Sequence, residues 1–148
     1  MAVNNMLYTP LTVKAMLLAE QYHSGQYDKN GAPYLFHVYD VACGVHTEDE
    51  ICVALLHDIL EDTKCSEETL RCHFPDKIVE AVKIMTHSKK DSYIEYITKV
   101  KQNPIARQVK LSDIRNNTRE DRMSNLDEYT KARLLNKYKS ALELLSEN

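Results

Sequence analysis

A stretch in the middle of the chain is apolar on every face that a helix could present. Residues 51–60 are apolar except at His57 and Asp58. A helix that is apolar all round is a buried helix, so other elements must pack around this segment. It therefore carries an imidazole and a carboxylate into the core, where an unpaired carboxylate is costly.

The composition of the 148-residue chain favours helices around this segment. Three glycines and four prolines fall well below the combined average share of about 12%, and long helices tolerate few of either residue. No segment alternates apolar and polar residues as a half-buried strand does. No repeat or shift in composition divides the chain. We therefore predict an all-α fold, with one domain over residues 1–148 that forms a compact bundle of seven or eight helices.

Capping and turn residues predict where these helices begin and end. Thr9-Pro10 and Asn103-Pro104 each place a cap residue before a first-turn proline, and residues 47–50 fit a capping box. Gly31-Ala32-Pro33 is the clearest loop. The expected helices run from residue 10 to before residue 25, from 34 to 44 or 46, and over about 47–62, 66–74, 76–86, 92–102, 103–117 and 127–145.

The charge balance argues against several classes of partner. The chain has 19 Lys and Arg against 22 Asp and Glu, whereas proteins that bind nucleic acids or membrane surfaces are usually basic. The longest apolar run, residues 51–56, is far shorter than the ~20 residues of a membrane span. No secretory signal is visible near the N-terminus. We expect a soluble cytoplasmic protein without nucleic-acid or membrane partners. A homodimer stays open, because nothing identifies an interface.

The buried His57 and Asp58 need a compensating partner. A divalent cation is the most economical one, since it satisfies a neutral imidazole and a carboxylate together. In a continuous helix, Glu61 lies one turn after His57, and Asp62 lies one turn after Asp58. The alternative is a core histidine bonded to a neighbouring aspartate, with Glu61 and Asp62 simply solvated. The spacing alone does not decide between the two interpretations.

A metal site needs further ligands, and two positions can supply them. His37 follows Pro33-Tyr34 at the start of the second expected helix. Asp113 lies on a later helix with Asn117 four residues on, so both share a face. Two histidines and two aspartates would suit manganese, iron, cobalt or zinc rather than calcium. Taken singly, a solvated His37 and a surface Asp113 are the simpler interpretations.

The order His37, His57-Asp58, Asp113 resembles the HD-domain metal-dependent phosphohydrolases, in which such residues bind one metal. Three stretches narrow the resemblance to the alarmone hydrolases, the Rel/Spo homologue hydrolase domain. They are His23-Ser24-Gly25-Gln26 with Lys29, Gly31 and Pro33-Tyr34; Ala54-Leu55-Leu56-His57-Asp58-Ile59-Leu60-Glu61-Asp62-Thr63; and Val109-Lys110-Leu111-Ser112-Asp113 with Asn117. Together they cover about residues 23–117.

The resemblance implies a small stand-alone hydrolase that uses Mn²⁺ to remove the 3′-pyrophosphate of guanosine tetra- or pentaphosphate, (p)ppGpp. It implies an anionic guanine nucleotide as the substrate, with GDP or GTP and pyrophosphate as products. Glu61 and Asp62 would perform acid and base catalysis, in an order that the sequence leaves open. The implied metal ligands are His37, His57, Asp58 and Asp113. The implied substrate contacts are Lys29, Lys89, Asn117 and, on a looser alignment, Tyr138.

One position departs from the family pattern. Asp28 precedes Lys29 where the family usually has an arginine that stacks on guanine, and a carboxylate cannot do this. Tyr27 could offer a stacking surface instead. Two alternatives therefore stay open: an HD-type phosphohydrolase for another nucleotide, and a non-catalytic module that holds a nucleotide. The presence of both Glu61 and Asp62 beside the expected ligands favours an enzyme.

Other polar residues receive simpler interpretations. Lys110 and Arg115 could neutralise a pyrophosphate, but we expect both on the solvated surface. His23 is expected to form hydrogen bonds beside the site rather than to bind metal. The remaining histidines are expected to be surface or packing residues: His46, His73 and His87.

Overall fold

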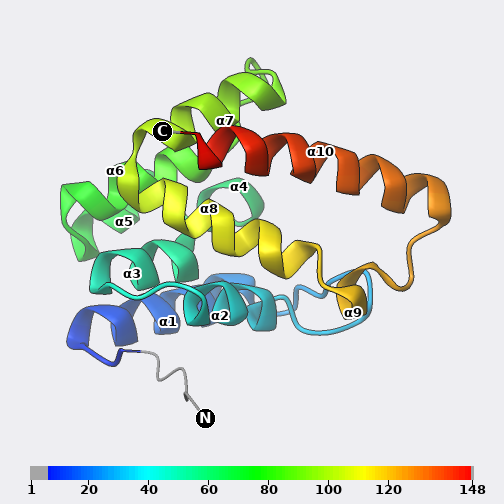
Figure 1. The fold of residues 1–148 in the computed structure, drawn as a ribbon. Helices are drawn as coiled ribbons and strands as arrows, with labels where there is room; N and C mark the ends of the chain where they lie inside the picture. The colour runs from blue at the N-terminus through cyan, green and yellow to red at the C-terminus, as the bar shows by residue number, and fades with distance from the viewer. Residues whose placement is uncertain (1–6, 148) are drawn as a thin grey trace, which may run out of the picture.

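The computed structural model describes residues 7–147, and helices account for all the regular structure there apart from one isolated bridge between Tyr27 and Pro33 (Figure 1). The predicted domain, 1–148, extends past these residues at both ends. In chain order the helices are α1 (Pro10–His23), α2 (Leu35–Cys43), α3 (Glu48–Leu56), α4 (Ile59–Asp62), α5 (Glu67–His73), α6 (Asp76–Met85), α7 (Tyr93–Gln102), α8 (Pro104–Asn117), α9 (Glu120–Met123) and α10 (Glu128–Ser146). The predicted all-α bundle is confirmed.

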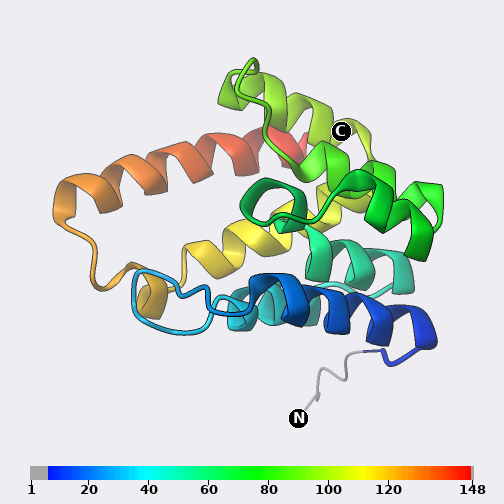
Figure 2. The same cartoon turned by 180° about the vertical axis from the view of Figure 1, so that it is seen from behind.

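The predicted buried helix is α3, at the centre of the bundle. Every residue from Ile51 to Leu56 is at most 1% exposed. α3 packs against α1, α2, α6 and α8, and both views show it between α1 on one side and α8 on the other (Figures 1 and 2). The apolar character on all its faces follows from this surrounding by helices.

The predicted start signals act locally as expected. Thr9 and Thr47 form capping boxes with Thr12 and Glu50. The Asn103 side chain accepts the backbone N–H of Ala106 at 3.0 Å, at the start of α8. These caps satisfy N–H groups that have no partner within the helix.

The prediction of one continuous helix over residues 47–62 is wrong. α3 ends at Leu56, and α4 begins at Ile59. The ring Nδ1 of His57 donates to the carbonyl oxygen of Ala54 at 2.6 Å, which satisfies a carbonyl at the end of α3. Successive side chains on a continuous α-helix point in directions about 100° apart. Because the helix is interrupted here, the side chains of His57 and Asp58 can approach each other.

The segment between α1 and α2 lies against α9. Gly25 and Gly31 adopt φ values of +83° and +82°, which glycine accommodates without strain. Asn30 donates to the carbonyl of Asp121 at 3.1 Å and accepts from Asn125 at 2.6 Å. Figure 2 shows this segment close to α9, while α10 crosses above α8. One end of the bundle is therefore built from parts of the chain that are distant in sequence.

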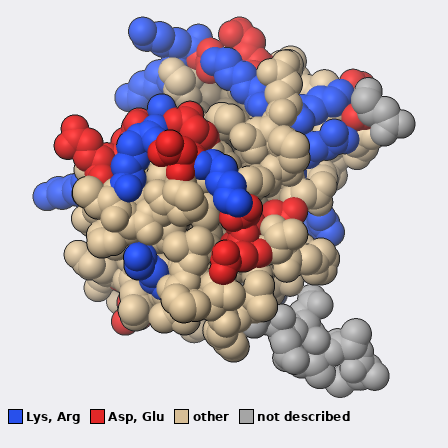
Figure 3. Space-filling model, turned by 90° about the vertical axis from the view of Figure 1, so that its left-hand side faces the viewer, with Lys and Arg blue, Asp and Glu red and all other residues tan. Residues whose placement is uncertain are grey.

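Charged side chains of both signs are intermixed on the face that Figure 3 shows. Ion pairs join some of the charged side chains of the protein, and Arg71 pairs with Glu67, Asp76 and Glu80. Among the helices of residues 7–147, none has both the length and the hydrophobicity that crossing a membrane requires.

Candidate metal centre and adjoining cavity

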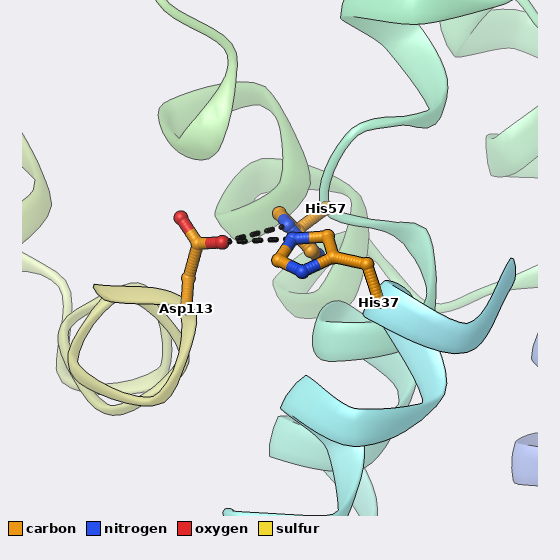
Figure 4. A group of neighbouring side chains, drawn as sticks. All are labelled: His37, His57 and Asp113. Carbon is orange, nitrogen blue, oxygen red and sulfur yellow. Dashed lines mark ion pairs between the residues drawn. The ribbon is translucent and has the colours of Figure 1, made fainter. Parts of the chain in front are cut away.

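Two helices and the α3–α4 break bring four predicted ligands together. Nε2 of His37, on α2, lies 3.0 Å from Oδ1 of Asp113, on α8. Nε2 of His57 lies 3.5 Å from the same oxygen and 3.0 Å from Oδ2 of Asp58. Nε2 of His37 lies 3.9 Å from Oδ2 of Asp58. Figure 4 shows both imidazoles directed at the Asp113 carboxylate.

The orientation of His57 is typical of a metal ligand. Its Nδ1 must carry the hydrogen, because the Ala54 carbonyl can only accept. Nε2 is completely buried and has no hydrogen-bond partner among the described residues, although two carboxylates lie nearby. Histidine ligands usually donate a hydrogen bond from the ring nitrogen that does not bind the metal, and this bond fixes the orientation of the ring.

The other three side chains are oriented by neighbours in the same way. Nδ1 of His37 lies 2.6 Å from Oδ1 of Asn116. Oδ2 of Asp58 accepts a hydrogen bond from the hydroxyl of Tyr34. Asp113 accepts from Asn117 on Oδ1 at 3.2 Å, and its other oxygen binds a lysine described below. Each candidate ligand thus has a partner that holds its direction.

Ligand atoms of His37, His57 and Asp113 all lie within 4.8 Å of one another and could hold a metal ion, while Asp58 groups in the same way with Glu61 and Asp62 and adjoins the first group through His57. Ligand distances of about 2.1 Å place neighbouring ligand atoms roughly 3.0–3.4 Å apart, close to most of the separations in this centre. Two imidazole nitrogens and two carboxylate oxygens suit manganese, iron, cobalt or zinc, whereas calcium takes six to eight oxygens. The buried, unpartnered Nε2 of His57 is the observation that supports this fit.

Residues 15–131 match the HD-domain family. The chain belongs to this family. One relative is a guanosine-3′,5′-bis(diphosphate) 3′-pyrophosphohydrolase of Haemophilus influenzae, which is 36% identical to this chain over 70 residues. The aligned region covers 45% of this chain and 10% of the relative. A protein of the same name from Aquifex aeolicus is 30% identical over 112 residues, 68% of this chain and 16% of the relative. The chain thus spans only about a tenth to a sixth of these relatives.

A solved structure has the same fold as this HD domain. It belongs to a metazoan ortholog of SpoT that is described as hydrolysing ppGpp and as playing a role in starvation responses. The TM-score is 0.79 at 22% identity, and the match covers 96% of this chain and 89% of the other. At this identity the likeness concerns the fold.

Electrostatics in the HD domain favour a positive charge at the centre. Burial alone would raise the pKa of Asp58, but His57 outweighs burial and lowers it to about 2. Burial disfavours a charged His57, yet Asp58 and Asp113 raise the pKa of His57 well above its usual value. The two carboxylates thus favour a positively charged His57. A bound cation would supply the same compensation.

The expectation that Lys110 is solvated is wrong. Lys110 is only 9% exposed, and its Nζ lies 2.9 Å from Oδ2 of Asp113. Burial opposes the ionisation of Asp113, but Lys110 outweighs burial and holds the pKa of Asp113 well below its usual range. Arg115 is exposed, as expected.

The two candidate catalytic carboxylates lie at the edge of the centre. Carboxylate oxygens of Glu61 and Asp62 lie within 4.8 Å of one another and of an Asp58 oxygen. Glu61 accepts the backbone N–H of His87 at 2.8 Å. Burial, followed by the charges of Asp58 and Glu61, raises the pKa of Asp62 to about 6. Both residues are exposed, so solvent or a ligand can reach them.

A cavity of about 370 Å³ adjoins the centre. Two of its lining residues, Tyr34 and Asn117, also contact the candidate ligands Asp58 and Asp113. The predicted contacts Lys29, Asn117 and Tyr138 all line it, whereas Lys89 lies outside it, exposed between α6 and α7. The full lining is Tyr27, Asp28, Lys29, Asn30, Tyr34, Asn117, Arg122, Leu126, Leu134 and Tyr138.

Asp28 is compensated within this cavity. Its Oδ1 accepts the backbone N–H groups of Asn30 and Ala32 at 2.8 and 3.0 Å. Its Oδ2 lies 3.5 Å from a guanidinium nitrogen of Arg122. The carboxylate thus stabilises its own loop and pairs with an arginine that the fold brings from α9. The cavity therefore holds a guanidinium, though not at the position next to Lys29.

The remaining histidines divide as the sequence indicates. His23 is buried beside the centre, with Nδ1 2.8 Å from Oε1 of Gln26 and its ring 5.3 Å from that of Tyr34. His46 and His73 are exposed. His87 stacks on Tyr96 with ring centroids 4.6 Å apart.

Sequence reasoning missed the residues that hold the ligands in place. The sequence gives Tyr34 and Asn116 no separate role, although they contact Asp58 and His37. It also indicates no helix at Arg122, which pairs with Asp28 in the cavity. The one signal in the sequence is that Asn116 and Asn117 are adjacent on α8. Adjacent helical side chains point in directions about 100° apart, so the two amides can contact two different ligands.

Proposed function

We propose that this HD domain is a metal-dependent phosphohydrolase that removes the 3′-pyrophosphate of guanosine tetra- or pentaphosphate. The products would be pyrophosphate and GDP or GTP. The proposal rests on one observation, the convergence of two imidazole nitrogens and two carboxylate oxygens beside a cavity lined by tyrosines and cations. The names of the relatives support the choice of substrate.

His37, His57, Asp58 and Asp113 would hold the metal, with manganese as the proposed ion. When bound, a divalent cation polarises a phosphoryl oxygen and lowers the pKa of a coordinated water. The orienting bonds from Ala54 and from neighbouring side chains reduce the reorganisation needed for binding. We place this activity in the cytoplasm, where guanine nucleotides are available.

Glu61 and Asp62 would carry the proton transfers. The backbone N–H of His87 holds one oxygen of Glu61, so its carboxylate is oriented to take a proton from the attacking water. Asp62, with its pKa near 6, can hold a proton close to neutral pH and release it to the ribose 3′ oxygen. The water oxygen bonds to phosphorus as the bond from phosphorus to the 3′ oxygen breaks.

The cavity would hold the nucleotide. Tyr138 and Tyr34 offer aromatic surfaces, and Asn117 reaches from the centre to the cavity. Lys29 and Arg122 supply positive charge for phosphate groups. Lys89, outside the lining, would contact phosphates that extend beyond the cavity.

Pyrophosphate release from guanosine 3′,5′-bis(diphosphate), with manganese or with a chelator, tests the proposal. Wild type should release pyrophosphate only with the metal, and Asp58→Ala should lose both bound metal and activity. Asp76→Ala, an exposed acid at the start of α6, is the matched control and should behave as wild type. A folded His57→Ala or Asp58→Ala variant with wild-type metal content and turnover would contradict the assignment.

A second candidate is hydrolysis of another nucleotide at the same centre. The observation that favours it is Asp28, which places a carboxylate in the lining of the cavity. Turnover of nucleoside 5′-mono-, di- and triphosphates, compared with the 3′-pyrophosphorylated guanosine, separates the two. Binding of the nucleotide without any product would instead support a non-catalytic module.

A further inference from the structure

A buried lysine stands behind the candidate metal ligand Asp113. Lys110 and Asp113 are three residues apart on α8, so they share a face of that helix. The ammonium Nζ lies 2.9 Å from Oδ2 of Asp113, while Oδ1 of the same carboxylate points at the imidazoles of His37 and His57. The two oxygens of Asp113 therefore have different partners.

The ammonium of Lys110 is itself fixed by an aromatic ring. It lies 5.2 Å from the ring centroid of Tyr96, within the range of a cation–π interaction. The Tyr96 hydroxyl donates to the carbonyl of Met85 at 2.6 Å, and His87 stacks on the ring at an interplanar angle of 14°. Tyr96 is thus held from two directions, and Lys110 has little freedom to leave Asp113.

We propose that Lys110 is a positioning residue that holds one oxygen of Asp113, so that the other oxygen faces the imidazoles as the metal-binding atom, and that compensates the charge of the buried carboxylate. Without the ammonium, only the amide of Asn117 would still orient the carboxylate, which could then rotate more freely, and the carboxylate would lose its only positively charged lysine or arginine partner within residues 7–147. Asp58 differs, because its oxygen is oriented by the neutral hydroxyl of Tyr34. Of the two carboxylates, only Asp113 therefore has a lysine or arginine partner within residues 7–147.

This inference rests on the proposed function only in requiring a cation at the centre. It concerns metal affinity and geometry, so hydrolysis is not needed to test it. Partners that orient metal ligands typically change metal affinity by about 10- to 100-fold when they are removed. We expect a loss in this range for Lys110→Met, which keeps the length of the side chain and removes the charge.

The experiment titrates Co²⁺ into the purified full chain and follows its visible absorption, with Mn²⁺ affinity measured by competition with a chelator. Lys110→Met should bind both ions about 10- to 100-fold more weakly and should shift the Co²⁺ bands. Lys110→Arg, which retains the charge, should recover affinity to within about tenfold of wild type. Lys99→Met is the matched control, since it breaks a 2.7 Å Lys–Asp pair at the surface, where Lys99 is 61% exposed.

A second variant covers the case in which Lys110→Met does not fold by circular dichroism. Lys110→Gln keeps a hydrogen-bond donor for Asp113 without the charge, and it should show the same direction of change. A folded Met or Gln variant with wild-type affinity and wild-type Co²⁺ bands overturns the proposal, and so does tighter binding. If wild type itself binds neither ion, the proposed metal centre fails as well, which separates the two failures.

Discussion

The phenolic hydroxyl of Tyr34 donates a hydrogen bond to Oδ2 of Asp58, the same oxygen that lies 3.0 Å from Nε2 of His57. This bond links the cavity to the candidate metal centre, because Tyr34 lines the cavity as well. Tyr34→Phe keeps the ring and removes only the bond. We expect metal affinity to fall by about 10- to 100-fold, as measured by chelator competition.

Tyr27→Phe is the control for this prediction. Tyr27 lines the same cavity and is exposed, and its hydroxyl forms no hydrogen bond within residues 7–147. Its substitution should leave metal affinity unchanged. Equal affinity in wild type and Tyr34→Phe would show that Asp58 needs no hydroxyl to keep its orientation.

Metal binding should stabilise the folded protein. A ligand that binds only the folded state at 100 times its Kd adds about 2.7 kcal/mol to the free energy of unfolding. For a chain of this size, that gain raises Tm by about 5–10 °C. Thermal unfolding with manganese and with a chelator measures the difference. His37→Ala should remove it, whereas an equal rise in Tm for this variant would place the stabilising metal elsewhere.

Arg122 and Asp28 should have opposite effects on substrate binding. Arg122→Gln removes a guanidinium from the cavity, and we expect KM for the nucleotide to rise by about tenfold or more, with a smaller change in kcat. Asp28→Asn keeps an oxygen for the N–H of Asn30 but removes a negative charge, so KM should fall. Steady-state kinetics test both expectations. Arg115→Gln, outside the cavity lining, should match wild type.

The helical fold could be predicted because its signals are local. Caps such as Thr47 and the apolar faces of residues 51–56 depend on neighbours in sequence, and the structure contains both features. The break after Leu56 has no such signal, since Asp58 makes no side-chain capping bond at the start of α4. The break is stabilised instead by the His57–Ala54 bond within the packed centre.

The site was predictable only where unusual residues interrupt a pattern. His57 and Asp58 stand out because they interrupt an apolar run, and the structure brings them together with His37 and Asp113. Their roles as ligands stay predictions. Lys110 resembles any helical lysine in sequence, and only the packing of α7 against α8 buries it beside Asp113. A residue that orients a ligand through packing between helices produces no recognisable pattern in its local sequence.

The final prediction concerns the pH dependence of stability in the metal-free protein. Because the pKa of Asp62 is raised to about 6, the folded state holds this proton more tightly than the unfolded chain does. Below about pH 4 the residue is protonated in both states and has no effect. Above about pH 6 it is ionised in both, and its charge destabilises the folded state. Asp62→Asn should therefore be more stable than wild type at pH 7, by about 1 kcal/mol or less, because Asp62 is exposed.

Urea unfolding in the presence of a chelator, at pH values from about 4 to 7, measures this difference. The advantage of Asp62→Asn should shrink as the pH falls and vanish near pH 4, since protonation then neutralises the wild-type carboxylate. Glu143→Gln, an exposed acid on α10, should show no such trend. A variant less stable than wild type at pH 7 would mean that the ionised Asp62 is favourable in the folded state. Its repulsion by Asp58 and Glu61 would then be outweighed by a partner, and its role as a proton donor near neutral pH would lose its physical basis.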